Sequence, residues 1–328
     1  MFDFTVIVLP GAYGSSVAAT LDMLQAACGL APRVGAPVPR WRVCSPEGGE
    51  VRLLSGLRLD TARLPLRARS DRSTWILPGL GLHTEGQLRQ ALQEPALQQL
   101  AAALAAHVRR GGRVAAGCSA VFLLHGAGLL EGRRATTSWW LAPLLQRLAP
   151  AGRIEADRMV CADGPVTTGG AAFAQADLML HLLRERCGAV LADAVSRFLL
   201  VDARQAQASY RIPEVMANGD EFIARLVARV EGALPNPPDI ATLAREFCVS
   251  QRTLARRVQR TTGKGPLALL QGVRLRRART LLEQSRLSVE QVAAAVGYSD
   301  ATALRRLMRK ATGANPSRYR APAASASG

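Results

Sequence analysis

The chain has 328 residues and a formal net charge of +17, so it is long enough for two domains that each bury a core of their own. No uncharged apolar run reaches the ~18 residues that a membrane-spanning helix needs. The opening Phe2–Leu9 has no basic flank and breaks at Pro10-Gly11, so we expect a first β-strand and not a signal peptide. The six cysteines show neither Cys-x-x-Cys nor a His-paired metal spacing. We therefore expect a cytoplasmic protein with reduced thiols, no metal, no cofactor and no membrane partner.

The positive charge is concentrated toward the C-terminal end of the sequence. Residues 225–328 hold 19 Lys and Arg against 6 Asp and Glu, whereas the first 224 residues hold 23 against 19. This asymmetry favours a polyanion-binding module joined to a nearly neutral domain, although a solvated basic face gives the same pattern. All the cations except Lys264 and Lys310 are arginines. Arginine suits bidentate contacts with phosphate and guanine, but a biased genomic base composition also produces this excess.

In the first part of the chain, short apolar runs bounded by Gly or Pro alternate with longer helical segments. The predicted strands are Phe4–Leu9, Trp41–Cys44, Thr74–Leu77, Arg113–Ala116 and Val166–Thr168, and the predicted helices are Ser16–Cys28, Glu85–Arg109 and Ala171–Arg186. This alternation predicts an α/β fold with a mostly parallel sheet covered by helices on both faces. Ligands bind such sheets beyond the carboxyl ends of the strands. Here those ends are Pro10-Gly11, Pro78–Gly81 and Gly117-Cys118-Ser119.

Cys118 occupies the most suggestive of these strand ends. The strand-like Arg113–Ala116 precedes it and the apolar Ala120–Leu124 follows as a helix, so the cysteine lies on a sharp strand-to-helix turn that is typical of a nucleophile. The positive end of the following helix favours a thiolate there. A small buried hydrophobe fits the same position, and a redox-sensing thiol is a further alternative.

Four motifs in this part of the chain resemble a known family. They are Leu9-Pro10-Gly11, Ile76-Leu77-Pro78-Gly79, Ala116–Ser119 and Gly132–Thr137. Together they resemble the PfpI-like, class I glutamine amidotransferase-like domain, and more narrowly its GlxA-type branch, in which that domain is the sensor of an AraC-family regulator. The resemblance implies a flavodoxin-like sandwich over residues 1–203.

Hydrolytic relatives in that family pair the cysteine with a histidine and an acid, since the thiol needs a base and a positioned proton donor. By motif position, the two places for the histidine fall on Ser119 and Ser138, and the place for the acid falls on Ser16, with Asp22 nearby. His125 lies seven residues beyond Cys118, about 10 Å along a helix and too far to act on the thiol. The other histidines match no motif: His83, His107 and His181. We therefore expect no enzyme, and the alternative is a cysteine-dependent hydrolase or deglycase with an accessory DNA-binding domain.

A family domain without catalytic partners predicts a site that binds a ligand without converting it. The resemblance implies a small metabolite such as an amino acid or a quaternary amine. Trp139 and Trp140 follow the Ala-Thr-Thr motif, and an indole face binds a quaternary cation well. Core or interface packing is the alternative for both. The predicted ligand-binding residues are Pro10, Gly11, Pro78, Gly79, Cys118, Ser119, Trp139 and Trp140.

The last hundred residues contain one pattern twice. Val249–Arg257 and Tyr298–Arg306 each follow a short apolar helix and a tight turn, and Leu254 and Leu304 lie fifty residues apart. Each copy is typical of a helix-turn-helix unit whose second helix enters a major groove. We predict a linker at residues 204–219, an all-α DNA-binding domain with two such units at 220–320, and a disordered tail at 321–328.

Caps and turns delimit the helices of this domain. A first helix begins near residue 220, and Ser250 then caps a recognition helix that ends at Gly263. A long helix follows at Pro266–Glu283. The second unit opens on a Ser-x-x-Gln capping box at Ser288, and Asp300 caps its recognition helix. Four arginines of the long helix are expected in solvent or near phosphate: Arg274, Arg276, Arg277 and Arg279.

This part of the chain resembles the AraC/XylS family of DNA-binding domains. The resemblance rests on Gly297-Tyr298-Ser299 and on Gly313–Arg320. By motif position it implies outward-facing, DNA-contacting residues at Gln251, Arg252, Ala255 and Arg256 in the first recognition helix and at Ala301, Thr302, Arg305 and Arg306 in the second. The two alanines suit a thymine methyl group, because they cannot hydrogen-bond a base. Arg257 and Arg309 are expected to contact phosphate alone.

The sequence therefore predicts a transcription factor whose N-terminal domain binds a metabolite and whose C-terminal domain binds double-stranded DNA at two major-groove segments about 34 Å apart. The resemblance implies a homodimer and an activator that acts with RNA polymerase, while the residues themselves do not separate activation from repression. A nonspecific architectural DNA binder is a further alternative.

Overall fold

A computed structural model of the chain describes residues 2–65, 71–201, 221–263, 265–285, 287–312 and 315–319. The chain divides into two compact units, residues 1–207 and 208–328. The predicted linker at 204–219, the predicted tail at 321–328 and the Gly313-Ala314 step of the terminal motif lie outside the described residues. The exact domain boundaries therefore stay a prediction.

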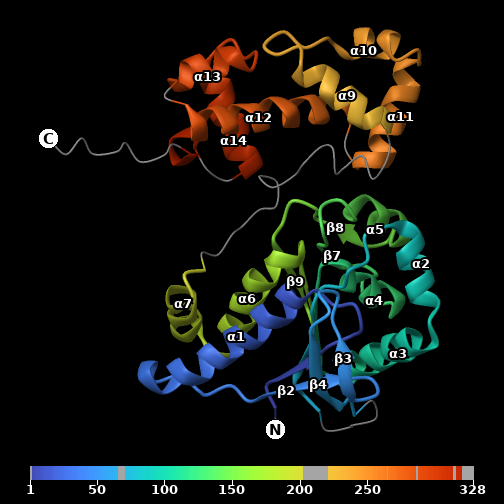
Figure 1. Cartoon of the computed structure of the whole chain (residues 1–328), viewed down its shortest axis with the longest axis vertical. Helices are drawn as coiled ribbons and strands as arrows, with labels where there is room; N and C mark the ends of the chain where they lie inside the picture. Colours follow the sequence, from blue (N-terminus) through green and yellow to red (C-terminus); the bar gives the residue numbers. More distant parts are fainter. Residues whose placement is uncertain are drawn as a thin grey trace, which may run out of the picture. The chain divides into compact units, whose positions relative to one another are not determined.

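A mostly parallel β-sheet lies at the centre of the first unit (Figure 1). Its strands are β1 Phe4–Ile7, β2 Trp41–Ser45, β3 Gly49–Arg52, β4 Arg58–Arg63, β5 Thr74–Leu77, β6 Arg113–Gly117, β9 Val160–Asp163 and β10 Val166–Gly169. In the part of this unit that the structure describes, the eight strands run in the order β3-β4-β2-β1-β5-β6-β10-β9. The antiparallel pairings lie at the two edges, β3 with β4 and β9 with β10, and the inner strands are parallel. A separate short pair consists of β7 Arg134–Ala135 and β8 Arg153–Ile154.

Helices cover both faces of this sheet (Figure 1). Their bounds are α1 Gly14–Leu30, α2 Glu85–Gln93, α3 Pro95–Arg109, α4 Val121–Gly126, α5 Ala142–Leu148, α6 Gln175–Cys187 and α7 Ala189–Phe198. Helices α1, α6 and α7 pack together on one face, and α2, α3 and α4 pack together on the other. This three-layer arrangement confirms the predicted α/β fold.

The central strands β1 and β5 are buried along their whole length, since helices shield them on both sides. All four residues of β1 and all four of β5 are buried, which explains why these segments are continuous apolar runs without a polar alternation. Phe4, Ile76 and Leu77 have no exposed surface. The burial of each such side chain contributes about 1.5–3 kcal/mol to the stability of the unit.

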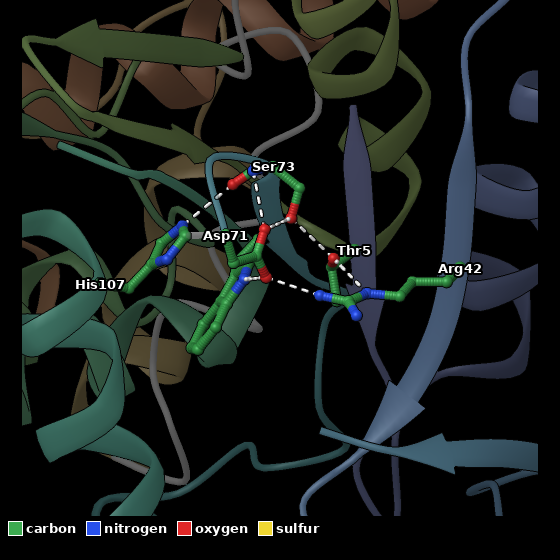
Figure 2. Close-up of polar contacts among 6 residues, drawn as sticks. Thr5, Arg42, Asp71, Ser73 and His107 are labelled. Atoms are coloured by element: carbon green, nitrogen blue, oxygen red, sulfur yellow. Dashed lines mark hydrogen bonds and ion pairs between the residues drawn. The ribbon is translucent and has the colours of Figure 1, made fainter. Parts of the chain in front are cut away.

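A polar cluster lies at the amino ends of the central strands (Figure 2). The carboxylate of Asp71 accepts hydrogen bonds from the Arg42 guanidinium at 2.5 Å and from the Ser73 hydroxyl at 2.7 Å. The Ser73 hydroxyl also lies 2.7 Å from Oγ1 of Thr5, and the Ser73 carbonyl lies 2.9 Å from Nε2 of the buried His107. The cluster therefore joins β1, β2 and α3 to the start of β5, at the end of the strands opposite to their carboxyl termini.

The structure differs from the predicted elements of this unit in three respects. The predicted helix Glu85–Arg109 is two helices, because Glu94 is extended and Pro95, which starts α3, has no amide hydrogen to continue the first one. The α-helical part of the predicted Ala171–Arg186 begins only at Gln175, after a 3-10 turn. Strands β3, β4 and β9 and helix α7 were not among the predicted elements.

The second unit contains helices and no strands among its described residues. Its helices are α9 Glu221–Glu231, α10 Ile240–Glu246, α11 Gln251–Thr262, α12 Pro266–Gln284, α13 Val289–Ala295 and α14 Ala301–Thr312, followed by a 3-10 turn at Pro316–Tyr319. The three predicted N-caps are present. The side chains of Ser250, Ser288 and Asp300 each accept a hydrogen bond from a backbone amide of the helix that follows. The capping box at Ser288 is reciprocal.

Two separate hydrophobic cores share the long helix α12. Its first part contributes Leu269, Leu270 and Val273 to a core with α9, α10 and α11. Its second part contributes Ala278 and Leu282 to a core with α13 and α14. Each helix-turn-helix unit therefore packs on its own stretch of α12.

Candidate DNA-binding face and elbow-cysteine site

The recognition helix of the first helix-turn-helix unit, α11, has a polar and positively charged outer face. Leu254 and Val258 are fully buried and fix the side of the helix that packs inward. The predicted DNA-contacting residues lie on the remaining surface, where Gln251, Arg252 and Arg256 are exposed and Ala255 is half-buried. These residues occupy the first two turns of the helix, the part that reaches base edges in a major groove.

The recognition helix of the second unit, α14, repeats this arrangement with one correction. Leu304 is fully buried, while Thr302, Arg305 and Arg306 are exposed as predicted. Ala301 is only 8 % exposed and belongs to the core of this half, so the prediction that it faces outward is wrong. Ala301 is the first residue of α14, and the packing of α14 turns it toward the core.

Three of the four arginines on α12 have partners inside the unit. Arg276 forms an ion pair with Glu231 of α9 at 2.6 Å, and Arg279 forms one with Glu283 at 2.6 Å. The guanidinium of Arg274 lies over the ring of Tyr298. These three side chains are only partly exposed, and the expectation that they lie in solvent or near phosphate stays a prediction. The fourth, Arg277, is exposed.

Two further arginines were expected to contact only phosphate. The guanidinium carbon of Arg257 lies 4.3 Å from the centre of the Phe222 ring. Nε of Arg309 donates a hydrogen bond to the side-chain oxygen of Asn315 at 3.2 Å. Both side chains therefore have partners within the unit, and the phosphate contacts stay a prediction.

Cys118 lies on the predicted sharp turn between β6 and α4. Its φ is 55°, a left-handed backbone conformation that costs a non-glycine residue of order 1–3 kcal/mol. Two hydrogen bonds hold the turn: its amide donates to the Gly170 carbonyl at 2.7 Å, and its carbonyl accepts from Oγ1 of Thr137 at 2.7 Å. The loop after β5 approaches so closely that a Cβ on Gly79 would lie 2.8 Å from Cβ of Cys118. Glycine is therefore required at position 79.

The thiol of Cys118 is enclosed by protein. Cys118 is 1 % exposed, and its Sγ lies 2.9 Å from Oγ of Ser138, with which it shares a hydrogen bond. Burial raises the pKa of the Cys118 thiol above its ordinary value, and hydrogen bonds from Ser138 and Ser119 offset only part of that effect. Burial therefore opposes the thiolate that the following helix was expected to favour.

Serines stand at the positions where the resemblance places the catalytic partners. Ser138 touches the thiol directly, and Oγ of Ser16 lies 3.4 Å from where a Cβ on Gly79 would be. The hydroxyl of Ser16 donates to the Ala172 carbonyl at 3.0 Å. The hydroxyl of Ser119 donates to a backbone carbonyl at 2.6 Å. None of these three hydroxyls is a base at neutral pH.

Tyr13 and His83, which belong to none of the four family motifs, lie beside this site. The Tyr13 hydroxyl lies 3.1 Å from Nε2 of His83. The two rings pack in a T-shaped arrangement, with centres 5.8 Å apart. Burial raises the pKa of Tyr13, and the negative charge that Cys118 would carry raises it further. Cδ2 of the Tyr13 ring lies 3.6 Å from where a Cβ on Gly79 would be, the same position that lies 2.8 Å from Cβ of Cys118. Tyr13 follows Pro10-Gly11, and His83 follows Pro78–Gly81. The carboxyl ends of neighbouring parallel strands lie side by side, so the position of both residues just after such strand ends could have predicted that they meet.

The remaining predicted ligand residues differ in accessibility. Pro78, Gly79 and Trp139 are buried, Gly11 and Trp140 are half-buried, and Pro10 is exposed. The rings of Trp139 and Trp140 meet at 81° with centres 5.1 Å apart. Trp139 is 5 % exposed and packs as a core residue, whereas Trp140 keeps accessible surface. A ligand contact by these residues stays a prediction.

Among the residues that the structure describes, no group of three or more histidine, cysteine or acidic side chains is arranged to hold a metal ion. No helix within the described ranges is long and apolar enough to cross a membrane. All six cysteines are free thiols.

Both units match known protein-family models. Residues 43–185 match the DJ-1/PfpI family, and residues 243–322 match a helix-turn-helix domain. A crystal structure of an AraC family transcriptional regulator from Pseudomonas putida is similar to 61 % of this chain over 100 % of its own length, with a TM-score of 0.51 and 22 % sequence identity. That likeness shows the fold of the first unit.

Relatives with both units are similar along most of the sequence. The HTH-type transcriptional regulator GlxA of Rhizobium meliloti is 31 % identical over 290 residues, which cover 87 % of this chain and 85 % of GlxA. The HTH-type transcriptional regulator CdhR of Pseudomonas aeruginosa is 30 % identical over 328 residues, which cover 97 % of this chain and 91 % of CdhR. The chain therefore belongs to the family of HTH-type transcriptional regulators that join a DJ-1/PfpI domain to an AraC-type helix-turn-helix domain.

Proposed function

We propose that this regulator binds specific DNA sequences under the control of a small metabolite bound to its first unit. The observation that carries the proposal is the pair of recognition helices, α11 and α14, each with exposed arginines opposite a buried leucine. Arg252 and Arg256 lie in α11, and Arg305 and Arg306 lie in α14. Guanidinium groups at the start of such helices suit bidentate contacts with guanine in the major groove.

The charge distribution supports the same division of labour. Residues 225–328 carry 19 Lys and Arg against 6 Asp and Glu, so the second unit is attracted to phosphate whatever the sequence of the DNA. Discrimination between sequences then falls to the side chains on the recognition helices. From the family resemblance, the proposal includes a homodimer held by the first unit and an activator that acts with RNA polymerase.

The first unit is proposed to bind its effector without converting it. The thiol of Cys118 is enclosed and has a raised pKa, and serines stand where a base and an acid would be needed. An effector is therefore expected to contact the more accessible groups around the strand ends, such as Tyr13, His83 and Trp140. An amino acid or a quaternary amine is the proposed class, on the family resemblance, and the half-buried indole of Trp140 suits a cation.

The test is selection of genomic fragments by the purified full-length chain at physiological salt, since low salt inflates nonspecific binding. The selection is run with and without added cell metabolites. Two variants are compared with the wild type, Arg252→Ala and Arg260→Ala. Both arginines are exposed on α11, but Arg260 lies near the end of the helix. Both variants therefore remove one positive charge, Arg252→Ala near the start of the helix and Arg260→Ala near its end.

The wild type is expected to enrich a few sites with a shared motif. Arg252→Ala is expected to lose about 1–3 kcal/mol of discrimination at particular base pairs, whereas Arg260→Ala weakens all sequences by a similar factor. Uniform enrichment by the wild type, with and without metabolites, would contradict sequence-specific regulation. Equal and uniform effects of the two variants would instead favour an architectural DNA binder.

A further inference from the structure

The two halves of the second unit meet at Gly297. This residue lies in the turn between α13 and α14, with a φ of 80° that favours glycine. A Cβ at this position would collide with the carbonyl oxygen of Pro235 and would lie 3.8 Å from Cζ of Arg274. Pro235 belongs to the segment between α9 and α10, in the other half of the unit. Backbone therefore packs against backbone between the two helix-turn-helix units.

Arg274 joins this contact to the long helix. Its Cζ lies 5.4 Å from the centre of the ring of Tyr298, the residue that follows Gly297, and both side chains are half-buried. Burial raises the pKa of Tyr298, and the charge of Arg274 offsets only part of that effect. The neutral ring presents an aromatic face to the guanidinium, an arrangement that stabilises a partly buried cation. Helix α12 is thus held to the turn of the second helix-turn-helix unit.

The helix α12 cannot by itself fix how the two halves are rotated. Its 19 residues span about 29 Å, and its two ends carry two separate cores. A twist or bend in the middle of α12 would leave each core intact while it turned α14 relative to α11. A contact away from the axis of α12 opposes such a motion, and the approach of Gly297 to Pro235 is such a contact.

We propose that Pro235, Gly297 and Arg274 form a joint that fixes the separation and the rotation of the two recognition helices. Gly297 is then a determinant of operator spacing, although glycine has no side chain with which to contact a base. One base pair more or less between two DNA segments moves the second segment by about 3.4 Å along the duplex and about 34° around it. A rigid pair of helices binds both segments at one spacing alone. This inference rests on the proposed binding of specific DNA.

The test uses the full-length chain and the motif that the wild type enriches from genomic fragments. Synthetic duplexes carry that motif with one or two base pairs added or removed between its two halves. The variant is Gly297→Asn and the matched control is Gly263→Asn. Gly263 ends α11 with a φ of 69°, and asparagine tolerates a positive φ better than other residues do. The two variants therefore share a backbone cost, and Gly297→Asn alone pushes against Pro235.

The wild type and Gly263→Asn are each expected to lose about tenfold in affinity, or more, for each base pair of changed spacing. Gly297→Asn is expected to bind all the spacings within about threefold of one another. The same sharp preference in Gly297→Asn as in the wild type would overturn the inference. A wild type that binds every spacing equally well would do so too. If the wild type enriches no motif, the proposed function itself fails, which is a different result.

Circular dichroism and thermal unfolding show whether Gly297→Asn folds. If it does not, a second variant, Arg274→Gln, keeps the test decisive. It removes the guanidinium from the ring of Tyr298 and adds no bulk. We expect it to bind the original spacing nearly as well as the wild type and the altered spacings better than the wild type does. A uniform loss at every spacing would assign Arg274 to phosphate contact and overturn its part in the joint.

Discussion

Asp71 shows how strongly one carboxylate can hold several strands together. Burial alone would raise the pKa of Asp71, but hydrogen bonds from Ser73 and Trp75 and the charge of Arg42 outweigh it and hold that pKa below its ordinary value. The substitution Asp71→Asn keeps the shape of the side chain but leaves Arg42 without its carboxylate. We expect the free energy of unfolding of the first unit to fall by about 2–3 kcal/mol. Urea denaturation measures the difference.

Glu50→Gln is the matched control for that change. Glu50 and Arg58 form an ion pair of 2.9 Å, but their side chains are 53 % and 63 % exposed. Water and salt screen such a pair, so the control is expected to change the stability by less than about 0.5 kcal/mol. Losses of equal size in the two variants would show that the cluster around Asp71 is no stronger than a surface ion pair.

Cys118 and Cys248 differ in how far their thiols are exposed to solvent. Cys118 is buried with a raised pKa, whereas Cys248 is exposed in the turn between α10 and α11. We expect an alkylating agent at neutral pH to modify Cys248 first and to leave Cys118 unmodified until the first unit unfolds, since only an accessible thiolate reacts. Mass spectrometry of peptides against time measures both rates. Rapid modification of Cys118 in the native protein would revive a catalytic or redox-sensing role.

At the scale of elements, the capping box of α13 is the feature that sequence and structure share most closely. The Ser288 hydroxyl accepts from the Gln291 amide at 3.1 Å, and the Gln291 side chain accepts from the Ser288 amide at 2.7 Å. Ser288→Ala removes the first of these bonds and is expected to lower the stability of the second unit by about 1 kcal/mol. Thermal unfolding measures it. The exposed Ser299 serves as the control, and a loss in Ser299→Ala as large as in Ser288→Ala would contradict a specific cap.

Elements were predicted well where their ends carry local signals, and poorly where distant segments decide them. The caps at Ser250, Ser288 and Asp300 are set by residues three or fewer positions away, and the structure contains all three. Strand β4, Arg58–Arg63, has no apolar run and is a strand because β2 and β3 pair with it from both sides. The prediction that Ala301 faces outward failed for a similar reason, since packing against α12 and α13 decides which way the first turn of α14 faces.

At the scale of the whole molecule, the sequence predicted where the site around Cys118 lies but not the protonation state of its thiol. The motifs placed Cys118, Ser138 and Gly79 at one end of the sheet, where the structure has them in contact. The state of the thiol depends on burial by several segments at once, which no single motif encodes. Tyr13 and His83 meet across 70 residues, and only the sheet order brings them together.

The two units are expected to respond separately to pH and to DNA, because all four histidines precede residue 182 and the cores are distinct. Burial lowers the pKa of His107 and of His125, so the unfolded chain takes up protons below about pH 6.5 that the folded unit does not. The free energy of unfolding of the first unit therefore falls as the pH is lowered through that value. In the second unit, Asp239 caps α10 by accepting a hydrogen bond from the Thr242 amide, as Asp300 caps α14. Both carboxylates have lowered pKa values, so their contribution to stability is lost only in stronger acid.

Differential scanning calorimetry of the full-length chain can separate these effects. Lowering the pH from about 7 to about 5.5 is expected to lower the Tm of the transition that belongs to the first unit and to leave the other nearly unchanged. Operator DNA at saturating concentration is expected to raise the Tm of the second unit by mass action, since it binds the folded form alone. The variant Ser288→Ala identifies the second transition independently. A single transition that moves with both acid and DNA would contradict independent units. A first transition insensitive to pH would contradict the lowered pKa values of the buried His107 and the half-buried His125.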